Sequence, residues 1–210
     1  PNGGKSYSSP HLVTIDGVTQ VVHMSEAGAT GFSPADGKQL WTIAWPGEDR
    51  ILQPTVTAEG DLLLGASGID FYMRRIAVTR AATGWKTTVR WESRGLQPNF
   101  TDSVIHRGHA YGFTGPRLAC IDLRDGTRKW RGAPYTGFSI LLADQGLLLV
   151  LSEKGELALV EATPARFQEL ARLRAVNGRS WNHQALAGDI LLARNASEMV
   201  AYRLPRAGNK

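Results

Sequence analysis

Cysteine is nearly absent from this sequence: the single residue Cys120 excludes a disulfide within the chain and offers no thiolate cluster to a metal. Long apolar runs are missing too, and no stretch approaches the roughly 18 apolar residues that cross a bilayer as a helix. Glycine-rich phosphate-binding signatures, Ser-His-Asp arrangements and zinc-type spacings are also lacking. No residue set therefore points to a recognisable catalytic site, and a buried, structural role is predicted for Cys120.

A concentrated patch of one charge is lacking as well. The chain has 24 Lys and Arg against 19 Asp and Glu, a net charge of +5, but the cations are scattered along it. A nucleic-acid surface needs clustered cations together with exposed aromatic rings. The aromatic residues here occur at repeated positions that we expect to be buried. The charge pattern therefore favours a solvated rim, and a nucleic-acid or acidic-surface binder is the weaker alternative.

Short glycine-containing turns between apolar runs are what the sequence does contain. They recur at intervals of 43, 48, 38 and 42 residues, at Gly17, Gly60, Gly108, Gly146 and Gly188. A hairpin signal that returns at this period is typical of radially repeated all-β folds, in which each unit needs a neighbour to cover its apolar face. We therefore predict an all-β chain, a β-propeller built of four-stranded antiparallel blades.

The apolar runs support this arrangement, since a run such as 147–151 is apolar on both faces and must be covered on both. About five blades are predicted within a single domain, 1–210, approximately at 8–45, 52–91, 96–131, 135–176 and 180–204. The fifth lacks room for a fourth strand. Because the chain also begins at Pro1 without a Met, we expect a processed or excised piece of a longer chain.

Tryptophan recurs at one position of the predicted blades, at Trp41, Trp91 and Trp130. Two of these residues follow an Asp-Gly turn, in which Gly takes positive φ at little steric cost. An indole at this place provides a large flat surface for the next blade and an N–H that can reach a backbone carbonyl. A structural docking role is therefore predicted for all three.

The segment 119–130 resembles the tryptophan-docking repeat of pyrroloquinoline-quinone-like propellers, whose pattern is Ala-x-Asp-x-x-Thr-Gly-Lys-x-x-Trp. Cys120 stands at the Ala of that pattern, Asp122 at the Asp, Asp125 at the Thr, Gly126 at the Gly and Trp130 at the Trp. Family members include quinoprotein dehydrogenases and outer-membrane assembly lipoproteins, usually with seven or eight blades. The resemblance thus implies an extracytoplasmic or periplasmic protein, and upstream blades or self-association that complete the ring.

Candidate site residues come from the starts of the first strands, which line the central channel of a propeller. Aligning the units on their turns places six polar side chains near the axis: Ser9, Gln53, Asp102, Ser139, Asn182 and His183. Such a group could hold a small polar ligand or a metal. The alternative is that a water-filled channel simply tolerates polar residues. His183 is the best single candidate, because an imidazole can ligate metal or move protons.

Two functions are carried forward. The first is a non-catalytic binding or scaffold module outside the cytoplasm, with a protein partner or a small polar ligand at the channel mouth. The alternative is a dehydrogenase that uses pyrroloquinoline quinone (PQQ) with calcium, which the family's enzymes hold through Glu, Asn and Asp ligands. That ligand set cannot be placed on this chain, so upstream blades would have to complete the site. No cofactor and no metal site are predicted under the first function.

Overall fold

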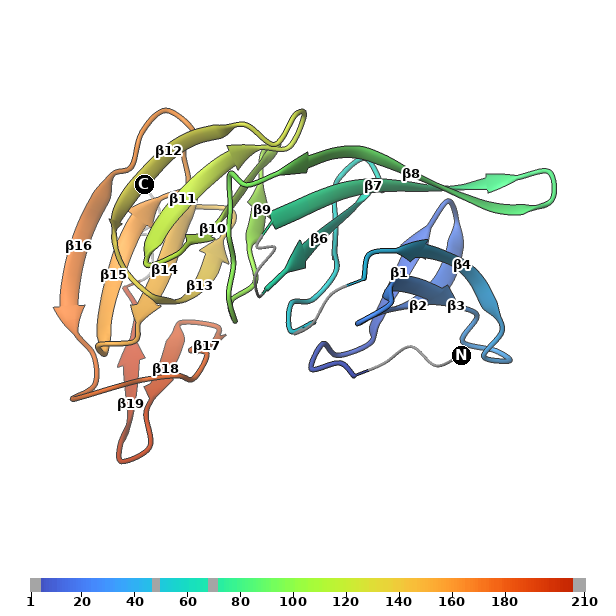
Figure 1. The fold of residues 1–210 in the computed structure, drawn as a ribbon. Helices are drawn as coiled ribbons and strands as arrows, with labels where there is room; N and C mark the ends of the chain where they lie inside the picture. The colour runs from blue at the N-terminus through green and yellow to red at the C-terminus, as the bar shows by residue number, and fades with distance from the viewer. Residues whose placement is uncertain (1–4, 47–49, 68–71, 206–210) are drawn as a thin grey trace.

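The computed structural model describes residues 5–46, 50–67 and 72–205, and these residues form nineteen strands and no helix. The strands make five antiparallel sheets in chain order (Figure 1). Sheet one contains β1 (His11–Ile15), β2 (Val18–Ser25), β3 (Gly28–Phe32) and β4 (Gln39–Ala44). Sheet two contains β5 (Thr55–Val56), β6 (Leu62–Ala66), β7 (Tyr72–Ala81) and β8 (Gly84–Ser93).

The remaining sheets continue the same up-and-down order. Sheet three contains β9 (Val104–His106), β10 (His109–Thr114), β11 (Arg117–Asp122) and β12 (Arg128–Pro134). Sheet four contains β13 (Gly137–Leu142), β14 (Leu147–Ser152), β15 (Glu156–Glu161) and β16 (Glu169–Arg174). Sheet five has only three strands, β17 (Ala185–Ala187), β18 (Ile190–Arg194) and β19 (Met199–Arg203). The described residues thus show four complete four-stranded units and a fifth unit of three strands.

The first hairpin turn of each sheet lies where the sequence predicted it. All five turn glycines have positive φ: Gly17, Gly60, Gly108, Gly146 and Gly188. In the first turn, Asp16 (φ 50°) and Gly17 (φ 75°) are both left-handed. Two consecutive left-handed residues match the right-handed twist of the flanking strands and make a two-residue hairpin loop.

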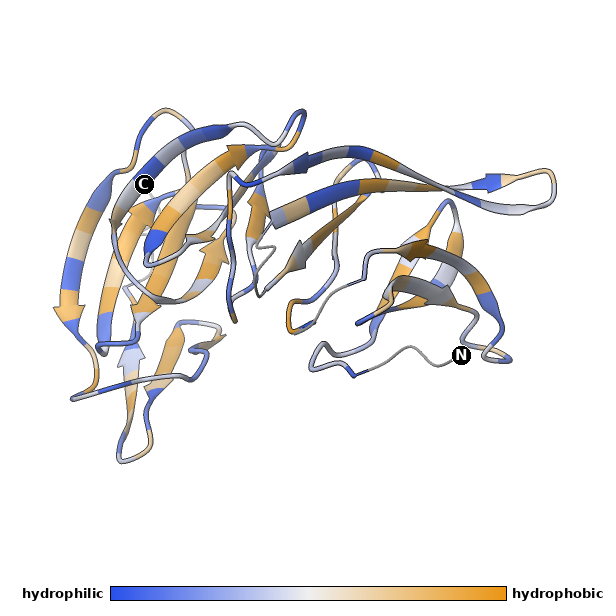
Figure 2. Ribbon diagram, in the orientation of Figure 1, coloured by the Kyte–Doolittle hydropathy of each residue, from blue (hydrophilic) through white to orange (hydrophobic). Residues whose placement is uncertain are grey.

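Four apolar cores fill the spaces between successive sheets. Strand β14 shows how one strand serves two of them. Leu148 and Val150 pack with sheet three, whereas Leu149 and Leu151 pack with sheet five. Since successive side chains of a strand point to opposite faces, both faces of sheet four are covered. This explains the unbroken apolar run at 147–151, and Figure 2 shows β14 largely in the hydrophobic colour, whereas the edge strand β16 alternates.

The sheets are arranged as the blades of a β-propeller that is open rather than closed (Figure 1). Sheet one lies at one end of the arc and sheet five at the other, and no strand described in one pairs with the other. The outward faces at both ends carry exposed apolar side chains, Leu12 on sheet one and Leu192 and Met199 on sheet five. Each end therefore presents a face of the kind that neighbouring sheets cover elsewhere in the molecule.

Two of the three repeated tryptophans join neighbouring sheets. The indole N–H of Trp91, on β8, donates to the carbonyl oxygen of Leu123 in sheet three at 2.8 Å. The indole of Trp130, on β12, donates in the same way to Thr163 in sheet four at 2.7 Å. Gly126 lies against the first of these contacts, and a Cβ there would come within 2.9 Å of the Trp91 ring. Each indole thus contacts the loop between the third and fourth strands of the next sheet.

Trp41 differs from the docking arrangement expected for it. Its indole N–H donates to the Gln20 side chain of its own sheet at 2.6 Å, and its ring lies over Gly31 on β3. The corresponding turn of sheet two lies at the tip of the long β7–β8 hairpin, which extends past sheet one in Figure 1. Because that turn is displaced, the Trp41 indole finds its acceptor inside sheet one.

Candidate functional site

Part of the predicted axial group does come together. The backbone N–H of Gln53 donates to Asp102 Oδ1 at 2.8 Å, so the segments that precede β5 and β9 are joined there. The Gln53 side chain in turn accepts from the hydroxyl of Ser8 at 3.4 Å. The ring of His183 lies against Phe138, with 4.0 Å between the ring centroids. The starts of all five described sheets therefore contribute to this region.

Burial shifts the pKa values of two side chains in this group. It raises the pKa of Asp102, although the Gln53 N–H and the positive potential of His183 and His11 oppose the rise. Removal from water likewise lowers the pKa of His183, and the Asp102 carboxylate opposes that shift. Desolvation disfavours the charged form of both groups. The pair is thus drawn toward the neutral acid and the neutral imidazole, each stabilising the charged form of the other.

Within the described ranges, no hydrogen bond joins Asp102 to His183, Ser9, Ser139 or Asn182. Ser9 is exposed and Asn182 is half-buried. The hydroxyl of Ser139 is buried and has no hydrogen-bond partner. The structure thus brings together Gln53, Asp102 and His183, while Ser139 contributes an unpaired hydroxyl and Ser9 lies at the surface.

A hollow adjoins the contact between His183 and Phe138, and it was not predicted from the sequence. This aromatic pocket has a volume of about 610 Å³ and is lined by Phe113 on β10, Phe138 on β13, and the loop residues Phe100 and Trp181. Phe100 is 58% exposed and Trp181 is 65% exposed. Large exposed aromatic side chains gathered in a concave site are typical of a binding surface.

A second hollow continues from the first, since the two share Thr136, Glu153 and Arg179 as lining residues. This cationic pocket has a volume of about 630 Å³ and is lined by the basic side chains Lys154, Arg172, Arg174 and Arg179 together with Glu153 and Glu156. The two pockets form one groove across sheets three and four and the loop that leads to sheet five. The groove is apolar at the end beside His183 and basic at the other end.

The cations of the groove differ in how far they are already paired. Arg172 forms ion pairs with Glu169 at 2.8 Å and with Glu156 at 3.3 Å, and its guanidinium lies over the Tyr135 ring. The guanidinium of Arg179 lies over the Trp181 ring, 5.1 Å from the centroid. Arg172 is thus part of a structural network, whereas Arg179 is free to meet an anion beside an aromatic face.

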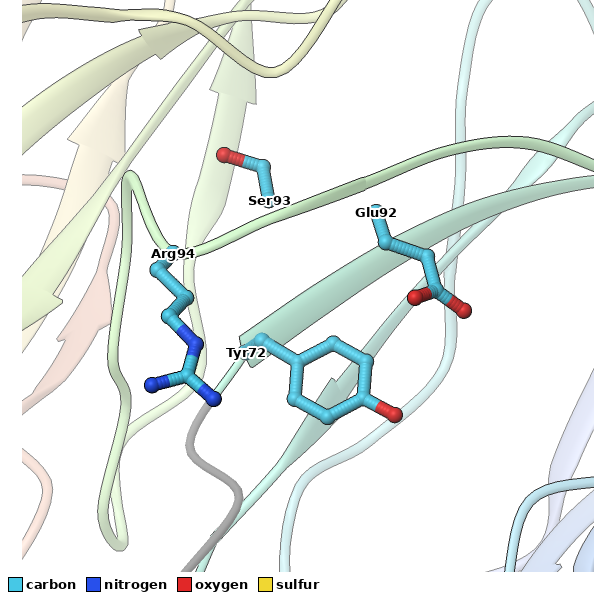
Figure 3. A pocket seen from close by; sticks show the side chains of 4 residues that line it. All are labelled: Tyr72, Glu92, Ser93 and Arg94. Atoms are coloured by element: carbon cyan, nitrogen blue, oxygen red, sulfur yellow. The ribbon is translucent and has the colours of Figure 1, made fainter.

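A third hollow, of about 350 Å³, lies where β7 begins and β8 ends, and it is shown in Figure 3. Tyr72, Glu92, Ser93 and Arg94 line it, and in this view the Ser93 hydroxyl points away from the other three side chains. Glu92 is paired with Arg74 at 2.6 Å, and the Arg74 guanidinium also lies over the rings of Tyr72 and Trp45. Two residues that line this hollow, Tyr72 and Glu92, are thus engaged in a stack that joins sheets one and two. The groove is therefore the better candidate site.

Among the residues that the structure describes, no three His, Cys, Asp or Glu side chains lie close enough together to hold a metal ion. Calcium requires six to eight oxygen ligands, of which carboxylates form a large part. Asp102 supplies one carboxylate, and its partners there are a backbone N–H and imidazoles. The described residues do not by themselves fit a calcium-bound quinone. They also contain no helix long and apolar enough to span a membrane.

No family model matches the chain, and no curated protein matches its sequence. Among solved structures, the chain is similar to the computationally designed protein Ika8, with a TM-score of 0.66 and 11% identity over 92% of this chain and 57% of Ika8. The likeness is one of fold. BamB from Moraxella catarrhalis gives a TM-score of 0.49 and 14% identity over 94% of this chain and 72% of that one. The chain spans a little over half the length of Ika8.

One sequence signal could have pointed to the groove. Phe100 and Trp181 both lie outside the repeated docking position, in loops rich in Asn, Ser, Gly and Pro. A large aromatic residue in such a loop has no neighbouring sheet to bury it, which favours a contact role. The cations Lys154 and Arg174 carried no comparable signal, since they are 20 residues apart in the sequence.

Proposed function

We propose that the protein is a non-catalytic binding or scaffold module that holds a partner in the groove across sheets three and four and the loop before sheet five. The observation that carries this proposal is the aromatic pocket, in which Phe100 and Trp181 remain exposed beside the buried ring of Phe138. Exposed Trp and Arg side chains at a concave surface are the residue types that contribute most to binding energy at interfaces. The rigid sheets hold the loops that carry them.

The proposal extends to where the protein acts and what covers its ends. A location outside the cytoplasm is supported by the resemblance of segment 119–130 to the pyrroloquinoline-quinone-like repeat. Completion of the ring by further blades or by a second copy is supported by the exposed apolar faces of sheets one and five. Measurement of mass in solution by light scattering tests self-association: a monomer at high concentration would leave upstream blades as the remaining explanation.

A quinone-dependent dehydrogenase is the alternative, and Asp102 beside His183 is the one feature that favours it. A carboxyl group whose pKa is raised by burial accepts a proton more readily than an exposed one and could serve as a base in such an enzyme. The test is to add PQQ and calcium to the protein and to measure reduction of an artificial electron acceptor with alcohols or sugars. Turnover that depends on both additions would overturn the scaffold proposal.

Binding itself can be measured at the tryptophans. The chain has six, so protein labelled with 5-fluorotryptophan gives six fluorine signals, and Trp181→Phe assigns the one in the groove. A panel of neutral peptides, acidic peptides, small polar ligands and oligonucleotides is then titrated in. The proposal expects at least one class to shift the Trp181 signal and to leave that of Trp130 in place. If no class moves Trp181, the groove is not a binding surface and the proposal fails.

A further inference from the structure

The groove is divided by chemistry into an apolar end and a basic end. At the apolar end, Phe113 and Phe138 project from β10 and β13, and Trp181 closes the pocket from the loop between β16 and β17. The volume of about 610 Å³ lies in the range of sites that bury one compact ligand group. An aromatic or large apolar side chain fits this end, because offset and edge-to-face contacts with its rings add to apolar burial.

The basic end carries more unpaired positive than negative charge. Arg172 is neutralised by Glu156 and Glu169, as described above. Among the described residues, no carboxylate forms an ion pair with Lys154, Arg174 or Arg179. Arg174 instead donates to the backbone carbonyl of Lys154 at 2.8 Å. Three cations are therefore available to a ligand.

Glu153 lies where the two pockets meet and lines both of them. Its backbone is fixed by hydrogen bonds, since its carbonyl oxygen accepts from the N–H of Ser180 at 2.9 Å, but its carboxylate has no partner within the described ranges. One acidic group thus separates the aromatic pocket from the three unpaired cations. A ligand that follows the groove passes this carboxylate before it reaches Arg174 and Lys154.

We infer that the groove binds an extended acidic peptide segment of a partner protein, with one aromatic side chain in the aromatic pocket and carboxylates at Arg179, Arg174 and Lys154. The inference rests on the proposed binding function and names its ligand class. Charge complementarity supports it, since three unpaired cations face one acid. A peptide is favoured over a nucleic acid because the exposed rings, Phe100 and Trp181, lie at one end of the groove and Arg174 and Lys154 lie at the other, whereas a strand needs exposed rings and cations along its whole track.

Fluorescence anisotropy of a labelled peptide tests the inference directly. The probe is a short Gly-Ser peptide that carries one Phe followed by three Asp. Matched peptides replace the Phe by Ser or the three Asp by Asn. The acidic aromatic peptide is expected to bind at least about tenfold more tightly than either relative at low salt, because each lacks one of the two contacts. The preference over the Asn peptide should fall as salt is raised.

Protein variants give the residue-level test, with controls of the same chemistry away from the groove. Arg179→Gln is expected to weaken binding of the acidic peptide about fivefold, and Trp181→Ser about tenfold or more. Glu153→Gln is expected to tighten it about twofold to fivefold, because an opposing charge is removed. Arg80→Gln, whose guanidinium stacks on Trp85 in the long hairpin, and Tyr7→Ser, whose ring is exposed, should leave it unchanged.

Four results would overturn the inference, and they separate it from the proposed function. If the acidic and Asn peptides bind equally, and Trp181→Ser abolishes binding of both, the binding function stands but the preference for an acidic ligand is refuted. Weaker binding after Glu153→Gln would refute the assigned direction of the acidic segment. Tighter binding of a single-stranded oligonucleotide than of the peptide would refute the ligand class. No response of Trp181 to any probe would refute both proposals.

Discussion

Removal of the indole N–H that joins sheets three and four is the sharpest perturbation of the fold. Trp130 is 9% exposed, donates to Thr163 at 2.7 Å, and contacts the rings of Tyr111 and Phe167 at centroid distances of 6.0 and 5.7 Å. In Trp130→Phe a ring remains between the two sheets, but the hydrogen bond and part of the apolar surface are lost. The change is therefore confined to one contact between two blades.

The magnitude follows from these two losses. A hydrogen bond of this kind contributes about 1 kcal/mol net, and Thr163 is only half-buried, so water can replace the lost donor in part. The smaller ring forfeits about 1 kcal/mol of apolar burial. Trp130→Phe should thus lower the free energy of unfolding by about 2 kcal/mol. For a chain of this length, that lowers the melting temperature by about 4 to 8 °C.

The assay is urea unfolding followed by circular dichroism, with Trp85→Phe as the control. Trp85 lies half-buried on β8, and its indole N–H has no acceptor among the described residues, so its replacement should cost under about 1 kcal/mol. Hydrogen exchange of the variant should show lost protection in sheets three and four and little change in sheet one, because each blade contacts only its neighbours. Equal destabilisation by the two variants would refute the assigned role of Trp130.

Three further predictions concern the docking turn and its neighbours. Arg124 lowers the pKa of Asp122 to about 2 by hydrogen bonding to its carboxylate, so this stabilisation is present above about pH 4 and is lost as the pH falls toward 2. Asp122→Asn should therefore lower the free energy of unfolding by about 1 kcal/mol at pH 7 after solvent screening. Unfolding measured at a series of acidic pH values should show this difference shrink. Gly126 has a φ of 74°, and a Cβ there would lie 2.6 Å from the side chain of Ser93, whereas Gly37 has a similar φ and open space around it. Gly126→Ala should therefore destabilise the fold by about 2 kcal/mol more than Gly37→Ala. Equal melting temperatures of the two variants would contradict this. Burial raises the pKa of Cys120 to about 12, so thiol reagents should label it only after unfolding, and rapid labelling of the native protein would show that the core is not closed there.

The repeated turns and the all-β fold could be predicted because local rules determine them. A glycine with positive φ between two apolar runs specifies a hairpin wherever it occurs, and each of the five turn glycines adopts that conformation. The run at 147–151 likewise required cover on both faces, and sheets three and five provide it. The acceptor of the Trp41 indole N–H could not be predicted, because it depends on the length of a hairpin in the next sheet. The period of the repeat does not reveal that length.

The site was predictable only in part, for a related reason. Asp102 and His183, both predicted near the axis, lie close enough for each to shift the pKa of the other, as expected where the starts of first strands converge in a fan of blades. The axial place of Ser9 stays a prediction: its side chain is exposed, and the neighbouring Ser8 is buried and hydrogen-bonded to Gln53. The groove depends on where irregular loops place Trp181 and Arg179 relative to sheets three and four, and no periodic pattern encodes such positions.

Successive sheets pack against one another in chain order, and the groove depends on this packing. Contacts of the indole N–H groups in solution are the most direct test of this packing. In nuclear Overhauser spectra of protein labelled with ¹⁵N-tryptophan, the Trp130 indole proton should contact protons of Thr163 and Phe167, and that of Trp91 should contact Leu123. Contacts restricted to each indole's own sheet, as expected for Trp41 with Gln20, would contradict the arrangement of the blades and the site built upon it.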